Sequence, residues 1–432
     1  MKHTFIFIMS LLFLTNQSYG QQDTLIFKYR RMAIDYQQSV KIAKKNLEGA
    51  NSLVEVAKTD YLPKIDLNGD YSYMGNPLQL GGTTENPEGQ LLSNKYQLGL
   101  WVSQPVWTGG YLKNTKNVLI AESDVARNYI GVSEQNTMLE ADFFYLNAVS
   151  KKEINLLATM YRQAIEAFLK VIQDRVDEEI AGMNELYQVK VRYNDAQYEE
   201  IRKEKEFRVS LMQLNRLIGV PLETESQHIN SLLIVNWSQF SENGVDKALE
   251  IRPEIMVKKS EVMVNQYNEK KMSSRYNPKI DIGLGVTYGA PSPELLTEPG
   301  SNYLVMAHLS VPVFYWGQKN KQVFAKQMET EQTNLELEKT KDIIKLQVVS
   351  GYYELQRSQK QVDFAFSAFD NSEKNVDVML DRYQEGLSSV LEVLDAELFW
   401  QKTYLNYIKA KLELNMAYSS YLKATGKLTV TQ

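Results

Sequence analysis

The chain of 432 residues contains no cysteine, and this absence excludes several kinds of site. Disulfide bonds, thiolate metal sites and a cysteine nucleophile all require that side chain. An N-terminal lipid anchor also requires a cysteine directly after the signal sequence, so we expect the exported chain to carry none. Histidine is nearly as scarce, and His3, His228 and His308 lie far apart without a neighbouring cluster of ligands. We therefore expect neither a metal site nor a cofactor.

The chain also lacks a strong excess of charge of either sign. Its 48 basic and 53 acidic side chains give a net charge of −5, and no block rich in lysine or arginine occurs. This composition gives no reason to expect nucleic-acid binding. Acidic pairs are scattered over the whole sequence, and Gly109–Gly110 has no phosphate-loop context. We therefore expect a protein that is not an enzyme.

Long apolar segments are absent as well. No stretch after the N-terminus offers about 18 consecutive apolar residues, so we expect no membrane-spanning helix. At the N-terminus, a short positive end precedes the apolar run Phe5–Leu14, and the small residues Ser18 and Gly20 follow it. This pattern predicts that residues 1–20 are a secretory signal peptide. The polar residues directly after it argue against the alternative, a buried N-terminal helix.

Two segments of the chain match two later ones. Tyr61–Leu62–Pro63–Lys64–Ile65 matches Tyr276–Asn277–Pro278–Lys279–Ile280 at an offset of 276 − 61 = 215 positions. Gln104–Pro105–Val106–Trp107 matches Val311–Pro312–Val313–Phe314 at an offset of 311 − 104 = 207. The offset falls by eight between these marks, so the second copy has a shorter loop there. Self-similarity of this kind indicates tandem copies of one structural unit.

The repeat divides the chain into four parts. The signal peptide is followed by a first structural repeat at residues 21–220, a linker at 221–245 and a second repeat at 246–432. Within each repeat we expect a helix, two strands, a long helix, a tip and a final helix. The loop between the two strands is rich in glycine, proline and asparagine in both repeats.

The helices are expected to be long. Their apolar residues alternate spacings of three and four, which is the heptad seam of supercoiled helices. In the first helix the seam comprises Ala33, Tyr36, Val40, Ala43, Leu47, Ala50, Val54, Ala57 and Tyr61. No proline occurs between Pro105 and Pro221, and about 70 residues of helix would extend about 100 Å. After the tip of the second repeat, the seam comprises Leu391, Leu394, Leu398, Gln401, Leu405, Ile408 and Leu412.

Four segments alternate apolar residues with small or polar ones, which is the period of a β-strand with two different faces. They cover residues 65–73, 96–106, 280–289 and 302–311. Runs of about ten such residues with tyrosine or tryptophan near their ends are typical of transmembrane barrel strands. Because four strands cannot close a membrane barrel, several chains would have to share one. The alternative is two soluble hairpins packed on the helices.

Each long helix is followed by a turn of small residues. The segments Arg175–Lys190 and Arg382–Glu397 contain these turns and lie 382 − 175 = 207 positions apart, so we expect each to be the tip of a helical hairpin. The second tip has the turn glycine Gly386. The first has Glu179 at the matching position, and we expect Gly182, three residues later, to serve as its turn residue instead.

With these features the chain resembles the TolC family of bacterial outer-membrane efflux proteins over essentially its whole exported length. The motifs that carry the resemblance are specific only together, in order and in duplicate. They are Tyr61–Leu62–Pro63, Gln104–Pro105–Val106–Trp107–Thr108–Gly109–Gly110, Arg252–Pro253–Glu254–Ile255, Val311–Pro312–Val313–Phe314–Tyr315–Trp316–Gly317 and the Arg382–Glu397 segment.

The resemblance implies a mixed α+β membrane protein that works as a homotrimer. Each chain would contribute four transmembrane strands to a twelve-stranded barrel in the outer membrane of a Gram-negative bacterium. Its antiparallel coiled-coil hairpins would form an α-helical tunnel through the periplasm, with the linker in an equatorial belt. The implied function is an exit duct for tripartite efflux or type I secretion. The implied partners are a periplasmic adaptor, an inner-membrane transporter and outer-membrane lipid.

The alternative function is that of a periplasmic coiled-coil structural or adaptor protein without a membrane barrel. The four alternating segments decide between the two functions, because only the duct needs them in a membrane. The resemblance specifies neither the transported substrate nor the pump.

The resemblance also assigns roles to residues of the tips, which would form the periplasmic entrance. Glu392 and Asp395 lie three residues apart, on one face of a helix, and would form a ring of six carboxylates in the trimer. The alternative is that both are ordinary solvated helix carboxylates.

In the family, polar links between the two tips close this entrance. Here Tyr383 and Glu185 would retain one link. The second pair would be Ser388 and Asn184, so the arginine that the family uses at that place is missing. We therefore expect a weaker latch.

Overall fold

The computed structural model describes residues 19–75, 93–225, 231–235, 244–290 and 299–430. Side chains are described from residue 25 onward. Residues 1–18 of the expected signal peptide and the linker residue His228 lie outside the described residues.

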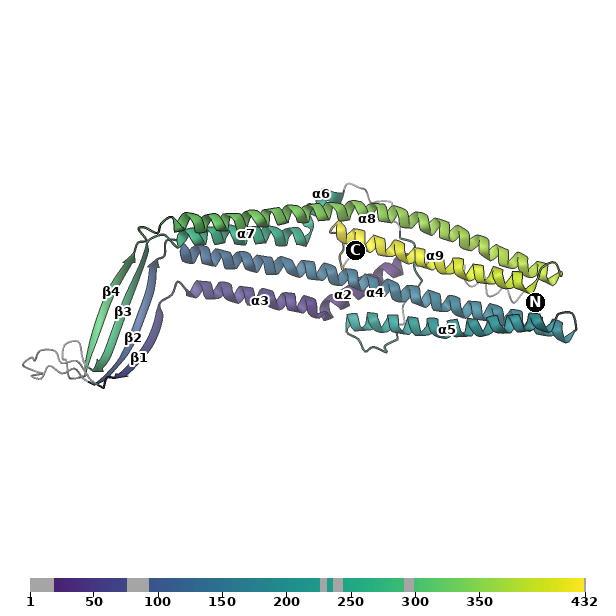
Figure 1. Cartoon of the computed structure of the whole chain (residues 1–432), viewed down its shortest axis with the longest axis horizontal. Helices are drawn as coiled ribbons and strands as arrows, with labels where there is room; N and C mark the ends of the chain where they lie inside the picture. Colours follow the sequence, from purple (N-terminus) through teal and green to yellow (C-terminus); the bar gives the residue numbers. More distant parts are fainter. Residues whose placement is uncertain (1–18, 76–92, 226–230, 236–243, 291–298, 431–432) are drawn as a thin grey trace, which may run out of the picture. The chain divides into compact units, whose positions relative to one another are not determined.

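Helices and strands follow one another in an order that occurs twice (Figure 1). The first half consists of α2 (Tyr19–Tyr36), α3 (Gln38–Thr59), β1 (Lys64–Tyr73), β2 (Asn94–Trp107), α4 (Tyr111–Asp177) and α5 (Met183–Ile218). The second half consists of α6 (Val245–Ile251), α7 (Pro253–Ser274), β3 (Lys279–Ala290), β4 (Gly300–Ser310), α8 (Gln318–Gln384) and α9 (Val390–Ala424).

The two long helices, α4 and α8, have the same length of 67 residues. Neither contains a proline, which would remove a backbone donor and kink the helix. Proline occurs instead where a helix starts, as at Pro253, because its fixed φ suits the first helical position. None of the helices in the described part of the chain carries an apolar stretch long enough to cross a bilayer.

The four strands form one antiparallel sheet in the order β1-β2-β3-β4 (Figure 1). The central pair joins the two halves of the chain, because β2 pairs with β3. Pro105 has no backbone N–H to donate, and the register of this pair shifts between Pro105 and Trp107. Within the described chain β1 and β4 each pair on one side only, so the sheet has two open edges.

The two faces of this sheet differ in the way that the alternation predicts. One face carries rows of directly opposed apolar side chains across all four strands, for example Leu67, Leu100, Val286 and Tyr303. These four are between 46% and 76% exposed, so no described helix covers the face. On the opposite face the ring of Trp101 lies over Gly285, where a Cβ atom would come within 2.4 Å of it. The alternative of hairpins packed on helices is therefore wrong for the described residues.

The described chain folds as two compact units, and each draws on both halves of the sequence. One unit comprises residues from 1–43, 129–255 and 340–432, and the other comprises residues from 44–128 and 256–339. The second unit contains the sheet. In its helices, buried hydroxyl groups pair with asparagine side chains, as between Asn265 of α7 and Thr333 of α8 at 2.7 Å. The first unit contains both tips, and an apolar core near them gathers Tyr161, Ile165, Phe168, Ile172, Leu186, Val189, Tyr383, Val390, Val393 and Leu394.

A buried ion pair in the first unit links three separate parts of the chain. Arg30 of α2 donates from Nε and Nη2 to the two carboxylate oxygens of Asp142 in α4, at 2.7 and 2.6 Å. Its Nη1 donates to the carbonyl oxygen of Thr429 at 2.8 Å. Arg30 is 3% exposed and Asp142 is 0% exposed. Because both charges are out of water, each depends on the other to remain in the core.

The linker is anchored to the same unit by polar side chains of α4 and α9. Glu153 accepts hydrogen bonds from Lys411 at 2.9 Å and from the backbone N–H of Leu232. Asn415 donates to the carbonyl oxygen of Leu233 at 2.8 Å. These bonds fix the described linker residues 231–235 without a helix or a strand.

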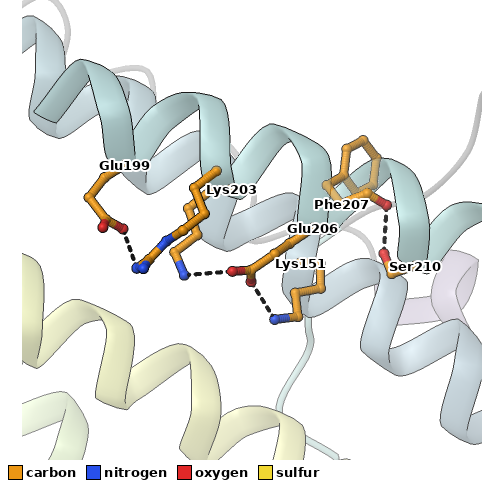
Figure 2. A network of polar contacts seen from close by, with 7 residues as sticks. Lys151, Glu199, Lys203, Glu206, Phe207 and Ser210 are labelled. Atoms are coloured by element: carbon orange, nitrogen blue, oxygen red, sulfur yellow. Dashed lines mark hydrogen bonds and ion pairs between the residues drawn. The ribbon is translucent and has the colours of Figure 1, made fainter.

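Figure 2 shows the polar contacts that join α4 to α5. Glu206 of α5 accepts from Lys151 of α4 at 2.7 Å and from Lys203 of its own helix at 3.1 Å. The hydrogen bond from Lys151 is the main reason why the pKa of Glu206 is lowered. Since Lys151 and Glu206 are about one-third exposed, such a pair contributes at most about 1 kcal/mol. The network is a solvated contact between helices.

The first helix was expected to be continuous, and the structure breaks it at Gln37. The side-chain amide of Gln37 donates to the carbonyl oxygen of Leu217, at the end of α5, at 2.6 Å. The ring of Tyr36 lies against Gly219, where a Cβ atom would come within 2.1 Å of it. Contacts with α5, rather than a proline or glycine in the helix, therefore accompany the break.

Candidate functional site at the two helical tips

The two tips close their long helices with the same hydrogen bonds. At the end of α4, Ile180 donates its backbone N–H to the carbonyl oxygen of Arg175 at 2.8 Å. At the end of α8, Leu387 donates to Arg382, also at 2.8 Å. Both bonds span five residues and lie 207 positions apart, which is the six-to-one bond of a Schellman motif in each copy.

A Schellman motif needs one residue with left-handed backbone, and the two tips supply it differently. Gly386 has φ +73° in the second tip. In the first tip Glu179 itself adopts φ +61°. Gly182, which was expected to replace the turn glycine, has φ −85° and is the N-cap of α5. That expectation was wrong, because Glu179 itself supplies the left-handed backbone of the motif. A residue with a Cβ atom is strained in that conformation.

Replacing Glu179 by glycine should therefore stabilise the protein by about 1 kcal/mol, because glycine adopts a left-handed φ without a steric penalty. Urea unfolding followed by circular dichroism measures the change. Glu178→Gly is the matched control, since Glu178 precedes the left-handed position and gains nothing from glycine. Equal effects of the two substitutions would show that the φ of Glu179 is not strained.

The two acidic residues expected at the pore lie on the exposed side of α9, and one of them caps the helix. Glu392 accepts a hydrogen bond from the backbone N–H of Ser389 at 2.7 Å, while its own N–H donates to the Ser389 hydroxyl at 3.3 Å. This capping box satisfies the free donors of the helix start. The bond from the Ser389 N–H is the main reason why the pKa of Glu392 is lowered. Asp395, one turn further on, is exposed and takes no part in the cap.

Tyr383 of α8 is buried among residues of the first tip. Its ring packs edge-on against Phe168 of α4, with 5.4 Å between ring centroids. The guanidinium carbon of Arg175 lies 4.8 Å from the centroid of the Tyr383 ring, and its Nη1 donates to the Tyr383 carbonyl oxygen at 3.1 Å. Burial raises the pKa of the Tyr383 hydroxyl, and the charges of Arg175 and of Glu185 in α5 act on that pKa in opposite directions. A direct bond between Tyr383 and Glu185 stays a prediction.

The second expected pair is not joined in this chain. Ser388 donates its hydroxyl to the carbonyl oxygen of Met379, within its own tip, at 3.2 Å. Asn184 is exposed beside Gly182 in the first turn of α5. No hydrogen bond connects Ser388 with Asn184 among the described residues. The polar contact between the tips therefore rests on Tyr383.

Sequence reasoning missed two residues of this region, Arg175 and Glu397. Glu397 of α9 is only 4% exposed. Burial raises its pKa to about 7, and the carboxylate of Asp377 in α8 adds to the effect. The buried hydroxyl of Tyr161 has no hydrogen-bond partner in the described chain, and the charge of Glu397 contributes to raising its pKa. Helical spacing from Val390 and Val393 would have placed Glu397 on the buried face.

The remaining polar residues do not form a second site of this kind. Within the described ranges no group of histidine, aspartate and glutamate is arranged to hold a metal ion. His308 lies on β4 opposite Asp281 of β3 and is exposed.

Comparison with known proteins agrees with this geometry. Residues 244–427 match the model of the outer membrane efflux protein family. No curated protein sequence matches the chain at a significant level.

Solved structures share the fold at low sequence identity. VceC from Vibrio cholerae is 14% identical with a TM-score of 0.77, over 94% of this chain and 97% of that one. CmeC from Campylobacter jejuni is 15% identical with a TM-score of 0.75, over 93% and 85% of the two chains. The open state of MtrE from Neisseria gonorrhoeae is 16% identical with a TM-score of 0.75, over 93% and 88%. The chain is thus similar to the outer membrane efflux protein family over residues 244–427, and it shares the fold of these solved structures over nearly its whole length.

Proposed function

We propose that this protein is the outer-membrane exit duct of an export system, through which an inner-membrane pump passes its substrates with the help of a periplasmic adaptor. The duct is a passive channel, and no step in it is catalytic. The observation that carries the proposal is the apolar face of the sheet, which runs through Leu67, Leu100, Val286 and Tyr303 and is covered by no described helix.

The sheet is suited to a membrane but cannot be complete in one chain. Backbone donors and acceptors at an open edge have no partner in lipid, so β1 and β4 must pair with strands of other copies. Three copies supply 3 × 4 = 12 strands, which is within the range of membrane barrels. We propose a homotrimer in which β1 of one copy pairs with β4 of the next, with the apolar face toward lipid.

The long helices support a trimer as well. On α8 the large apolar side chains of Leu335, Leu346 and Phe364 are 66%, 68% and 75% exposed. Exposed apolar residues spread along a whole helix are more than an isolated soluble chain needs. In the proposed tunnel they pack against helices of neighbouring copies. The sequence organisation of the duct is a signal peptide at 1–20, repeats at 21–220 and 246–432, and an equatorial linker at 221–245.

The test is where the protein resides and in what form. Fractionation of cells that express it should recover the chain in the outer membrane as a detergent-resistant trimer that becomes a monomer on heating. Recovery as a soluble periplasmic monomer would instead support the alternative, a coiled-coil structural or adaptor protein. A Leu67→Arg variant sharpens the comparison, because a charge on the lipid face should reduce assembly only if that face meets lipid.

At the entrance, we propose that Glu392 and Asp395 form the acidic ring. Asp395→Asn is the cleaner probe, because Glu392 also caps α9 and its loss would weaken the helix. In planar bilayers the cation-to-anion permeability ratio should fall about two-fold, since three of six ring charges are removed. Glu385→Gln, an exposed change in the turn of the same tip, is the control. An unchanged ratio in Asp395→Asn would mean that this residue does not line the constriction.

A further inference from the structure

The contacts of Arg175 join the ends of two helices from different repeats. It lies in the last turn of α4, and its Nη1 donates to the carbonyl oxygen of Tyr383 in the last turn of α8 at 3.1 Å. The last carbonyl groups of a helix carry partial negative charge and lack helical partners, so a guanidinium is favoured there. The same guanidinium lies over the Tyr383 ring at 4.8 Å, which adds a cation–π contact.

Its counterpart in the second repeat makes no such contact. Arg382 occupies the matching position, 207 residues later and in the same turn of the same motif. Its Nη2 donates to the carbonyl oxygen of Leu387 at 3.3 Å, so this contact stays within its own tip. Arg382 is exposed, whereas Arg175 is half-buried. The repeat therefore contains an internal comparison in which only one of two equivalent arginines bridges the tips.

Tyr383 is held by residues of the first tip. Phe168 packs edge-on against the ring, the guanidinium of Arg175 lies over the ring, and Arg175 donates to the backbone carbonyl. The charges of Arg175 on α4 and Glu185 on α5 also act on the pKa of the hydroxyl, in opposite directions. Any movement that separates α8 and α9 from α4 and α5 must break these contacts together. Arg175 contributes the only charge-assisted bond to the Tyr383 backbone among the described residues.

We propose that Arg175 is the cationic residue that holds the two tips together and so keeps the entrance closed. It is supplied by the first tip, because the second tip has Ser388 at the position where the family has an arginine. The inference rests on the proposed function, because it assigns the lock of that duct. In the closed state Arg175 holds the end of α8 through the backbone carbonyl and the ring of Tyr383. Opening releases the Tyr383 carbonyl and exposes the arginine to water.

Single-channel recording in planar lipid bilayers tests the lock. In Arg175→Ala, the fraction of time spent in the wide conductance state should rise about ten-fold, the effect of losing one charge-assisted hydrogen bond. Arg382→Ala should leave this fraction at the wild-type value. Arg175→Lys should fall between the two, since an ammonium group can reach the carbonyl but cannot stack on the ring with a planar fork.

A structural defect is distinguished from a released lock by two controls. The temperature at which the trimer dissociates should be the same in Arg175→Ala and Arg382→Ala. Arg175→Gln keeps the length of the side chain and serves if the alanine variant does not assemble. If Arg175→Ala and Arg382→Ala both assemble and spend the same fraction of time in the wide conductance state, the role of Arg175 is contradicted, but the proposed duct is not. A wild-type protein that forms no channel overturns the proposed duct, and the lock with it.

Discussion

Replacing Arg30 by methionine should lower the free energy of unfolding by about 3–5 kcal/mol, because it leaves the Asp142 carboxylate buried without its partner. Asp142 is 0% exposed and receives two hydrogen bonds from Arg30. Methionine fills most of the volume of the arginine stem, so the loss reports the charge rather than a cavity. Chemical unfolding of the protein in detergent, followed by far-ultraviolet circular dichroism, measures it.

A double-mutant cycle separates the pair from its surroundings. Arg30→Met with Asp142→Leu removes both charges, and apolar side chains of similar volume can replace a buried ion pair with little loss. The double variant should therefore be more stable than either single variant. Lys45→Met is the control, because the Lys45–Glu48 pair is 75% and 64% exposed and should contribute less than about 1 kcal/mol. Additive losses in the cycle would show that the two residues are not coupled.

Replacing Glu397 by glutamine should make the protein more stable at pH 8 by about 3 kcal/mol and leave it unchanged near pH 4. The pKa of Glu397 is raised from 4.5 to about 7 in the folded protein, first by burial and then by Asp377. Between these values the folded chain holds a proton that the unfolded chain has lost. Stability of the wild type therefore falls as the pH rises from about 4.5 to about 7, and the penalty stays constant above that range.

The groups around Glu397 do not offset this penalty. Asp377 faces it from α8, and Tyr161 faces it from α4. Arg192 and Asp195 of α5 act on Tyr161 with opposite signs. Glutamine keeps the shape without the charge, so the unfolding temperature of Glu397→Gln should lose the pH dependence that the wild type shows. Glu385→Gln in the exposed turn should track the wild type, and equal pH profiles for wild type and Glu397→Gln would show that Glu397 is hydrated.

The strands and long helices could be predicted because their signals are local. The alternation in 65–73 and 280–289 follows from the geometry of a strand, whose successive side chains point to opposite faces. The structure places Leu67 and Val286 on one face of the sheet. The length of α4 follows from the absence of proline inside it. Such patterns depend on the chain's own geometry rather than on distant contacts.

The features that sequence reasoning missed depend on distant contacts. The seam predicted for α9 is right in part, because Leu394 and Ile408 are buried, whereas Leu391 and Leu398 are 56% and 39% exposed. The predicted seam does not contain Glu397, which is buried as well. Similarly, Gln37 breaks a helix through a bond to Leu217, and no local signal announces it.

The site was predictable only in part. The repeat offset pointed to the tips, and the resemblance selected Tyr383, which is buried against Phe168 and Arg175 of α4. Arg175 and Arg382 occupy the same place in the two tips, so their positions in the sequence do not distinguish them. Only Arg175 reaches the other tip, through the Tyr383 carbonyl, and sequence spacing does not contain that information.

If the open edges of the sheet pair between copies, introduced cysteines on β1 and β4 should link neighbouring copies. The chain has no cysteine, so any disulfide comes from the introduced pair. Leu67→Cys in β1 is combined in turn with Tyr303→Cys, Val305→Cys and Leu309→Cys on the same face of β4. Directly opposed strand residues are close enough for a disulfide. We predict that one combination gives a covalent trimer on a non-reducing gel, whereas monomers in every combination would contradict a barrel shared by three chains.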